Sequence, residues 1–410
     1  MTEQKRPPAL FDAYGFTVDL AVVHSGSFDV QAVPKVLLEP TLADEDPARR
    51  DLEVIPGIAG HGLGVRNTKV MRRPSKWGRK LVNLRNAWAP ALDTAKALIL
   101  PGGAHPFYDP AHHGSVGEAL TPEVRRICDE LFGCAQHGWS NSQGLHLGIH
   151  FGKDSEFGKL HAAVRLLLPL IPSLAAASPI LEGRVTGSSC SRLHAQLHAH
   201  ERLTDLMGSF VPEPVFDREE HDRVIMAPIA QALAPHDPTG LLDPVLYNSR
   251  AATANFDRSV VTLHVIDTQE SPSANMAVAE MIITVLRALV RGRWVSNYLQ
   301  RAWGSDDLQQ LMLGAIKEGG RMMITNRDYL LMLGLMKQES MVAAKVWQHL
   351  FVELYGDLSE NARGHIGHIL EHGCLADRIL ARTGKQPTID GIRAAYGHLA
   401  ACYAADEAYL

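Results

Sequence analysis

Cysteine is scarce in this sequence. The 410 residues include five cysteines, an odd number, and no two of them form a CxxC pair. Disulfide frameworks need paired cysteines and thiolate zinc knuckles need closely spaced ones, so this pattern argues against both. We therefore expect a reducing compartment, with the cytoplasm as the location.

Long apolar runs and an excess of charge of one sign are also missing. The longest apolar stretch, LLLPLIPSLAAASPIL, contains three prolines and is too short to span a membrane, so it predicts a buried helix and its exit. The first ten residues, MTEQKRPPAL, lack the apolar core of a signal peptide. The 40 Lys and Arg residues against 45 Asp and Glu give no basic face for nucleic acid. We expect neither a nucleic acid nor a membrane as partner.

Apolar residues are otherwise plentiful, at 46% of the chain, so a large core can form. Runs typical of strands stand at residues 16–23, 97–103 and 259–268, with helical patterns at 122–133, 156–171 and 218–233. Because strands and helices do not alternate regularly, we predict an α+β fold with an antiparallel or mixed sheet. From about Ser273 the patterns are all helical. This divides the chain into an α+β domain, 1–273, and a helical region, 274–410, packed on it.

Strand alternation brings polar side chains to shared faces. In QGLHLGIHFG, residues 143–152, His146, Gly148 and His150 lie on one face of the predicted strand. In FTVDLAVV, residues 16–23, Thr17 and Asp19 lie opposite the apolar side chains. In SVVTLHVIDT, residues 259–268, the same rule places on one face Thr262, His264 and Ile266.

Five stretches, in the same order, resemble the bacterial glutamate–cysteine ligase and carboxylate–amine ligase family of the glutamine synthetase superfamily. They are PGGAHPFYDP, FGCAQHGWSNSQGLHLGIHFG, LHAAVRLLLPLIPSLAAASPILEGR, NFDRSVVTLHVIDTQESP and ILEHGCLADRIL. The resemblance implies a glutamine-synthetase-like sheet that lines a cavity. It also implies an ATP-dependent reaction in which a phosphorylated carboxylate is attacked by an amine. Such chemistry uses Mg²⁺ ions held by carboxylates.

Set beside the family, this chain has lost most of those carboxylates. The family's Glu-x-Glu becomes Thr17 and Asp19, and another ligand position is taken by Arg66 or Asn67. An arginine about 4 Å from a divalent ion costs on the order of 8 kcal/mol at an effective dielectric of ~20. Cys190 stands where the family has an aspartate, and Asn255 where it has an arginine. The family's Glu-Ile-Arg is replaced by Thr262, Leu263 and His264. Mg²⁺-ATP is therefore the less favoured cofactor, and the candidate catalytic residues that remain are Asp19 and Arg192.

The same cavity gains imidazoles. By the resemblance, His146 is inherited while His150 and His264 are new. Nitrogen ligands favour Zn, Fe or Cu, so one hypothesis is a transition-metal site of these three histidines, with Asp19 as fourth ligand or base. Two other interpretations stay open. In the first, the histidines fill the space of a site that has lost its function and hydrogen-bond to backbone carbonyls or water. In the second, they bind the substrate.

The loop PGGAHPFYDP corresponds in the family to the cavity mouth, which makes His105 and Asp109 candidate substrate-binding residues, together with Asn255. The prediction is a divergent homologue of the ATP-dependent ligases, repurposed or non-catalytic in the family reaction. The alternatives are a metalloenzyme that uses the histidine-rich cavity and an active carboxylate–amine ligase. A small-molecule ligand is expected, and a protein partner or a homo-oligomer is possible.

Overall fold

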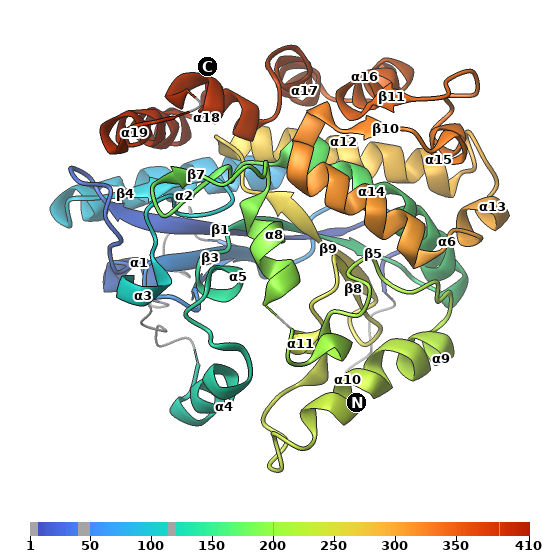
Figure 1. Ribbon diagram of the computed structural model, residues 1–410, viewed down its shortest axis with the longest axis horizontal. Coiled ribbons are helices and arrows are strands. Elements are labelled where there is room, and N and C mark those ends of the chain that lie inside the picture. The colour runs from blue at the N-terminus through green and yellow to red at the C-terminus, as the bar shows by residue number, and fades with distance from the viewer. Residues whose placement is uncertain (1–6, 40–49, 114–119, 200, 385) are drawn as a thin grey trace.

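The computed structural model describes residues 7–39, 50–113, 120–199, 201–384 and 386–410 (Figure 1). Its main sheet has seven strands in the order β2-β3-β1-β5-β9-β8, with β4 paired to the far end of β1. Every pairing is antiparallel, so the predicted α+β class with an antiparallel sheet is confirmed. The strands are β1 (Tyr14–His24), β2 (Leu52–Pro56), β3 (Gly62–Asn67), β4 (Ala97–Leu100), β5 (Gly144–His150), β8 (Ala252–Asn255) and β9 (Val260–Asp267).

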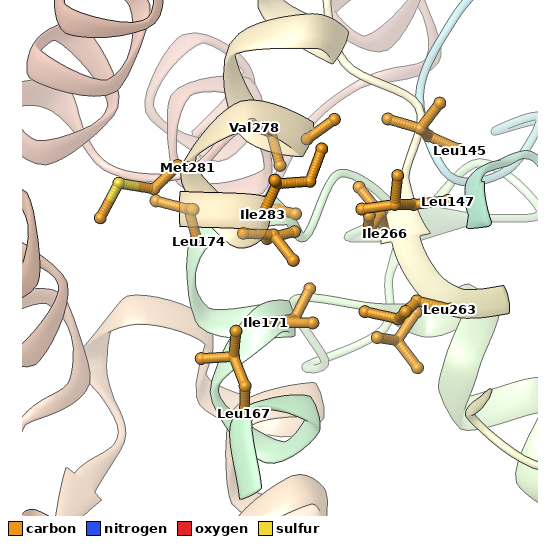
Figure 2. Packing of buried hydrophobic residues seen from close by; sticks show 14 of the residues in the cluster. Leu145, Leu147, Leu167, Ile171, Leu174, Leu263, Ile266, Val278, Met281 and Ile283 are labelled. Atoms are coloured by element: carbon orange, nitrogen blue, oxygen red, sulfur yellow. The ribbon is translucent and has the colours of Figure 1, made fainter. Parts of the chain in front are cut away.

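One face of this sheet is apolar and forms the core. In β1 the alternation predicted from the sequence holds, because Phe16, Val18 and Leu20 are buried while Thr17 and Asp19 are only partly buried on the other face. Figure 2 shows the apolar face, where Leu147 and Leu263 point toward the helices that cover it. The opposite, polar face of the sheet is therefore the one that can carry a functional site.

Long helices cover the apolar face. They are α2 (Pro74–Thr94), α6 (Asp154–Leu167) and α12 (Pro272–Val290), and α12 contacts both of the others. Residues Asp154–Ala175 and Pro272–Val290 are long and apolar enough to cross a membrane, yet 94% and 78% of their apolar windows are buried inside the protein. Both segments therefore serve as core helices here, packed against the sheet as Figure 2 shows.

Short elements surround the polar face. Figure 1 shows α4, α9, α10 and α11 on the opposite side of the sheet from α12 and α14. The predicted helices at 122–133, 156–171 and 218–233 are all present. The helix α6 continues on the core side through η2 (Leu168–Leu170) and α7 (Ile171–Ala175). The remaining short elements before β8 are α1 (Lys35–Leu38), α3 (Pro110–His113), α4 (Pro122–Phe132), α5 (His137–Ser140), β6 (Ile180–Leu181), β7 (Arg184–Val185), α8 (Ser191–His198), η3 (Thr204–Leu206), α9 (Arg218–His221), η4 (Asp222–Met226), α10 (Ala227–Leu233) and α11 (Pro244–Tyr247).

The C-terminal third is helical with one exception. The prediction of helices alone is wrong at β10 (Met323–Ile324) and β11 (Met341–Val342), which form a small two-stranded sheet. Runs of two residues are too short to give a periodic signal. The helical elements are α13 (Asn297–Arg301), α14 (Ser305–Glu318), η5 (Gly319–Arg321), α15 (Arg327–Met332), α16 (Ala343–Leu354), η6 (Tyr355–Asp357), α17 (Glu360–His372), α18 (Leu375–Thr383) and α19 (Ile389–Ala405).

The two predicted parts of the chain share one hydrophobic cluster. It contains Phe16 of β1 and Leu147 of β5, and also Val285 of α12, Trp347 of α16 and Tyr403 of α19. The change at residue 273 is therefore a change in secondary structure within a continuous core. The division into 1–273 and 274–410 stays a prediction.

A β-bulge interrupts the alternation of side chains between the two faces in β9. Leu145 pairs with Ile266, but Leu147 pairs with Leu263, so one extra residue of β9 lies between the two pairs. Figure 2 shows Leu263 and Ile266 both on the core side. The prediction that Ile266 shares a face with His264 is thus wrong, because the bulge reverses the alternation after His264.

Candidate functional site

A cavity of about 360 Å³ opens on the polar face of the sheet, and we call it the central cavity. Asp19, His146 and His264 come from β1, β5 and β9 and form its floor. The walls are supplied by the β2–β3 hairpin, by α5, by α8 and by the chain after α11. Wall residues include Ile58, His61, Trp139, Gln143, Arg192, Gln196, Leu246, Asn248 and Arg250.

A continuous chain of hydrogen bonds crosses the floor. Asp19 Oδ2 lies 2.8 Å from His146 Nε2. His146 Nδ1 lies 2.8 Å from His264 Nδ1, and His264 Nε2 lies 2.9 Å from Thr253 Oγ1. The chain thus joins a carboxylate, two imidazoles and a hydroxyl from four neighbouring strands.

The direction of these bonds follows from the carboxylate end. A carboxylate only accepts, so the His146 Nε2–H donates to Asp19. In a neutral His146 the Nδ1 atom then accepts, which makes the Nδ1–H of His264 the donor and leaves its Nε2 atom to accept from the Thr253 hydroxyl. Burial, His146 and Arg192 together hold the pKa of His264 well below its usual range, which agrees with a neutral imidazole. Every group in the chain is satisfied with both histidines neutral.

Two local features of the sheet make room for this arrangement. The β9 bulge places His264 beside His146, with ring centroids 5.0 Å apart. Opposite Asp19 stands Gly64 of β3, where a Cβ atom would lie 3.0 Å from Asp19 Oδ1 and 2.8 Å from Ile55 Cγ1. Gly64 therefore leaves space for the Asp19 carboxylate.

Arg192 lines the central cavity and is held by a buried ion pair. Its Nε donates to Asp267 Oδ1 at 2.6 Å, its Nη1 donates to the His264 carbonyl at 3.1 Å, and its Nη2 has no partner among the described residues. Burial alone lowers the pKa of Arg192, but Asp267 outweighs it, so the pKa is raised and the charge persists. Asp267 also accepts from the Ala177 backbone and the Ser178 hydroxyl. The pair fixes the guanidinium at the cavity wall.

Cys190, which the family resemblance placed near the cavity, lies behind this pair. Its Sγ is 3.4 Å from both oxygens of Asp267. Burial and the Asp267 carboxylate raise the pKa of the Cys190 thiol well above its ordinary value. The thiol stays protonated, which makes it a poor nucleophile and a poor metal ligand.

The three predicted metal ligands are only partly brought together. His146 and His264 are in contact, and Asp19 joins them, but His150 lines a neighbouring cavity, and its buried Nδ1 has no partner among the residues that the structure describes. Burial lowers the pKa of His150. Within the described ranges, no group of three or more His, Cys, Asp or Glu side chains has the geometry to hold a metal ion. The three-histidine metal site stays a prediction.

The predicted substrate-binding residues lie outside the central cavity's lining. His105 is fully buried behind His61, with ring centroids 5.6 Å apart. Asp109 accepts from His112 and from the Ala111 backbone before α3, and Asn255 accepts from the Arg258 backbone in the β8–β9 turn. Substrate binding by these three residues stays a prediction without a supporting contact.

Sequence reasoning missed several residues of the site. His61 lines the cavity, and burial, with a contribution from His113, lowers its pKa to about 4. Thr253 ends the hydrogen-bond chain, and Asp267 anchors Arg192. Strand alternation could have identified Thr253, because it pairs with Thr262 across β8 and β9 and lies on the same face. The β9 bulge conceals Asp267, because alternation alone assigns it to the core face.

Comparisons with known proteins agree with this architecture. No protein-family model matches the chain. An uncharacterised protein of Archaeoglobus fulgidus is 32% identical over 165 residues, 40% of this chain and 44% of that protein. A Bordetella parapertussis protein named "Putative glutamate–cysteine ligase 2" is 30% identical over 187 residues, 44% of this chain and 41% of that protein. The chain therefore covers less than half the length of these curated relatives.

Two solved structures match almost the whole chain. The glutamate–cysteine ligase of Francisella tularensis, solved in complex with AMP, superposes with a TM-score of 0.62 at 12% identity, over 95% of this chain and 89% of that one. A bifunctional glutathione synthetase from Pasteurella multocida gives 0.56 at 12% identity, over 97% of this chain and 53% of that one. The fold is thus that of the carboxylate–amine ligases. The chain is similar in fold to glutamate–cysteine ligases and similar in part of its sequence to proteins of that name, at low identity, as its motifs predicted.

Proposed function

We propose that this chain no longer catalyses the Mg²⁺-ATP-dependent reaction of its relatives and instead binds a small molecule in the central cavity. One observation carries the proposal. Asp19 is the single carboxylate among the described residues that line the central cavity, and His146 occupies one of its oxygens at 2.8 Å. Mg²⁺ sites that bridge a triphosphate are built from several oxygen ligands, preferably carboxylates, which this lining does not supply.

Charge around the floor supports the same conclusion. Arg66 pairs directly with Thr17 in the β1–β3 register, so its side chain emerges on the polar face beside the position where the family carries a metal-binding glutamate. Arg192 and Arg250 line the central cavity itself, and each is paired with a carboxylate, Asp267 and Glu213. These two arginines therefore present guanidinium N–H donors without net positive charge, and such donors favour a ligand with hydrogen-bond-accepting groups.

The hydrogen-bond chain gives the cavity a defined set of polar contacts. With the bond directions derived above, Asp19 presents an accepting oxygen, and His61 is a neutral imidazole near pH 7 because its pKa is about 4. The apolar side chains of Ile58, Trp139 and Leu246 form the rest of the wall. Binding sites for small molecules combine an apolar wall with a few placed polar groups in this way.

The test is ATP turnover. We expect no ADP release when the protein is incubated with Mg²⁺-ATP and amino-acid pairs that include glutamate and cysteine, while an active glutamate–cysteine ligase run in parallel releases ADP. ADP release that depends on an amino-acid pair and is lost in Asp19→Asn would show instead that the chain is an active carboxylate–amine ligase.

A second candidate function is a metalloenzyme, and the contact between His146 and His264 favours it. The Nδ1 atoms of His146 and His264 are 2.8 Å apart, and Asp19 lies on the same floor. A small movement of the two side chains would let them share one metal ion. Elemental analysis of protein purified without an affinity tag tests it. Stoichiometric Zn, Fe or Cu that disappears in His264→Ala supports the metalloenzyme, and metal-free protein rules it out.

We also propose a cytoplasmic location, which the cysteines support. All five are free thiols and all five are buried. A reducing compartment keeps thiols in this state. Fractionation of cells that produce the protein, with the chain followed by antibody, tests the location.

A further inference from the structure

A second cavity, of about 480 Å³, lies beside the central cavity on the same face of the sheet. We call it the basic cavity. The polar residues of its lining include Thr17, Arg66, Lys69, His150, Arg258 and Thr262. His146 lines both cavities, so a ligand in one lies next to the other.

Two glycines create the space on the floor of the basic cavity. Gly15 of β1 pairs directly with Gly148 of β5, and Gly148 pairs in turn with Thr262 of β9. A Cβ atom on Gly148 would lie 3.1 Å from Val260 Cγ2 and 3.5 Å from Gly15 Cα. The floor therefore carries no bulky side chain across three strands, and the volume is that of a small-molecule site.

The wall formed by β3 and the residues after it is cationic. Arg66 Nε donates to Glu53 Oε2 at 2.8 Å, but both side chains of this pair are more than 40% exposed and the bond uses one of five guanidinium N–H groups. Lys69 Nζ lies 2.8 Å from Asp51 Oδ1 and is 78% exposed. Both cations keep donors free for a further acceptor.

The opposite wall carries Arg258, in the turn between β8 and β9. Its guanidinium makes no hydrogen bond or ion pair with any residue that the structure describes. The neighbouring carboxylate, Asp257, already accepts from Arg218 Nη2 at 3.1 Å. Within the described part of the chain, no Asp or Glu lines the basic cavity. Three cations and three threonines therefore surround a space with no carboxylate among the described residues of its lining.

We propose that the basic cavity is an anion-binding site for a small molecule that carries a phosphate or two carboxylates. An oxyanion with two negative charges offers several acceptors to the guanidinium groups of Arg66 and Arg258, which bind such groups in a bidentate manner. The Thr17 and Thr262 hydroxyls supply donors at the floor. His146 then faces the remainder of the ligand. This site does not depend on the loss of ligase activity, so the two proposals fail separately.

Calorimetric titration of the full chain at low ionic strength tests the site, with inorganic phosphate and succinate as the probes. We expect at least one of them to bind, and its affinity to fall about tenfold or more in Arg258→Ala because a charge-assisted contact is lost. Phosphate binding alone assigns a phosphorylated ligand, and succinate binding alone assigns a dicarboxylate. Arg223→Ala, at an exposed arginine that does not line the cavity, is the matched control and should bind as the parent does.

Two results would overturn the proposal. One is the absence of binding heat with both probes. The other is equal affinity of the parent, Arg258→Ala and the charge reversal Arg258→Glu. Circular dichroism and the thermal midpoint, measured on each variant, verify that it folds, as we expect because the Arg258 side chain is exposed and has no partner in the described part of the chain.

Discussion

At the scale of single residues, the buried pair of Arg192 and Asp267 is the strongest local constraint on the site. Both side chains are at most 2% exposed, and the Asp267 oxygens accept from four different groups. Replacing one member of such a pair leaves the other charge buried without compensation. The position of the cavity wall and the stability of the fold are thus tied to one carboxylate.

We predict that Asp267→Ala lowers the free energy of unfolding by about 3–5 kcal/mol, because the Arg192 charge stays buried and unpaired. Urea denaturation followed by circular dichroism measures it. The matched control is Asp257→Ala, whose carboxylate is 85% exposed and pairs with Arg218, and which should change the free energy by less than about 1 kcal/mol. Equal, small effects of both substitutions would contradict the account.

A second residue-scale prediction concerns pH and His161 of α6. This ring is buried against Phe157, its Nδ1 donates to the Val215 carbonyl at 2.7 Å, and burial lowers its pKa to about 3. The unfolded chain binds the proton near pH 6.5 and the folded chain does not. Stability from this group is therefore complete above pH 6.5 and falls as pH drops from 6.5 toward 3, by about 1.4 kcal/mol per pH unit.

The measurement is the free energy of unfolding at pH 7.5 and at pH 5. The parent should lose on the order of 2 kcal/mol more over this interval than His161→Gln, which keeps a donor for the Val215 carbonyl and has no titrating group. If the two proteins lose the same amount, His161 does not titrate as its burial requires.

At the scale of elements, the sheet was predictable where alternation is regular. The pattern in β1 correctly placed Thr17 and Asp19 on the polar face, and the pattern in β5 placed His146 there. The β9 bulge was not predictable, because a period of two contains no information on register. The contact between His146 and His264 depends on that bulge, so the sequence could identify both histidines without predicting their hydrogen bond.

The β2–β3 hairpin gives an element-scale prediction. Gly64→Ala should lower the free energy of unfolding by about 1–3 kcal/mol, because its Cβ would lie 2.8 Å from Ile55 Cγ1 and 3.0 Å from the Asp19 carboxylate. Gly60→Ala, in the same hairpin, has nothing within 4 Å and is the control. Thermal or urea unfolding of the pair measures the difference. A Gly64 variant as stable as the Gly60 variant would show that Asp19 needs no such space.

At the scale of the whole molecule, motifs predicted the fold better than they predicted the site. The order of five motifs indicated the ligase fold, which the structural match to the Francisella enzyme at a TM-score of 0.62 bears out. Packing decides the rest: His105 lies behind His61 and His150 turns into a different cavity from His264. Such depths and directions arise from tertiary contacts among segments far apart in the chain, which no local pattern encodes.

The central proposal is that a hydrogen-bonded Asp19 stands on the floor of the cavity at a position where the family resemblance implies divalent ions. Electron paramagnetic resonance with Mn²⁺, the paramagnetic substitute for Mg²⁺, tests it on the whole chain in the presence and absence of ATP. The account predicts no Mn²⁺ bound to the protein under either condition. Two Mn²⁺ ions per chain with ATP present, lost in Asp19→Asn, would contradict it.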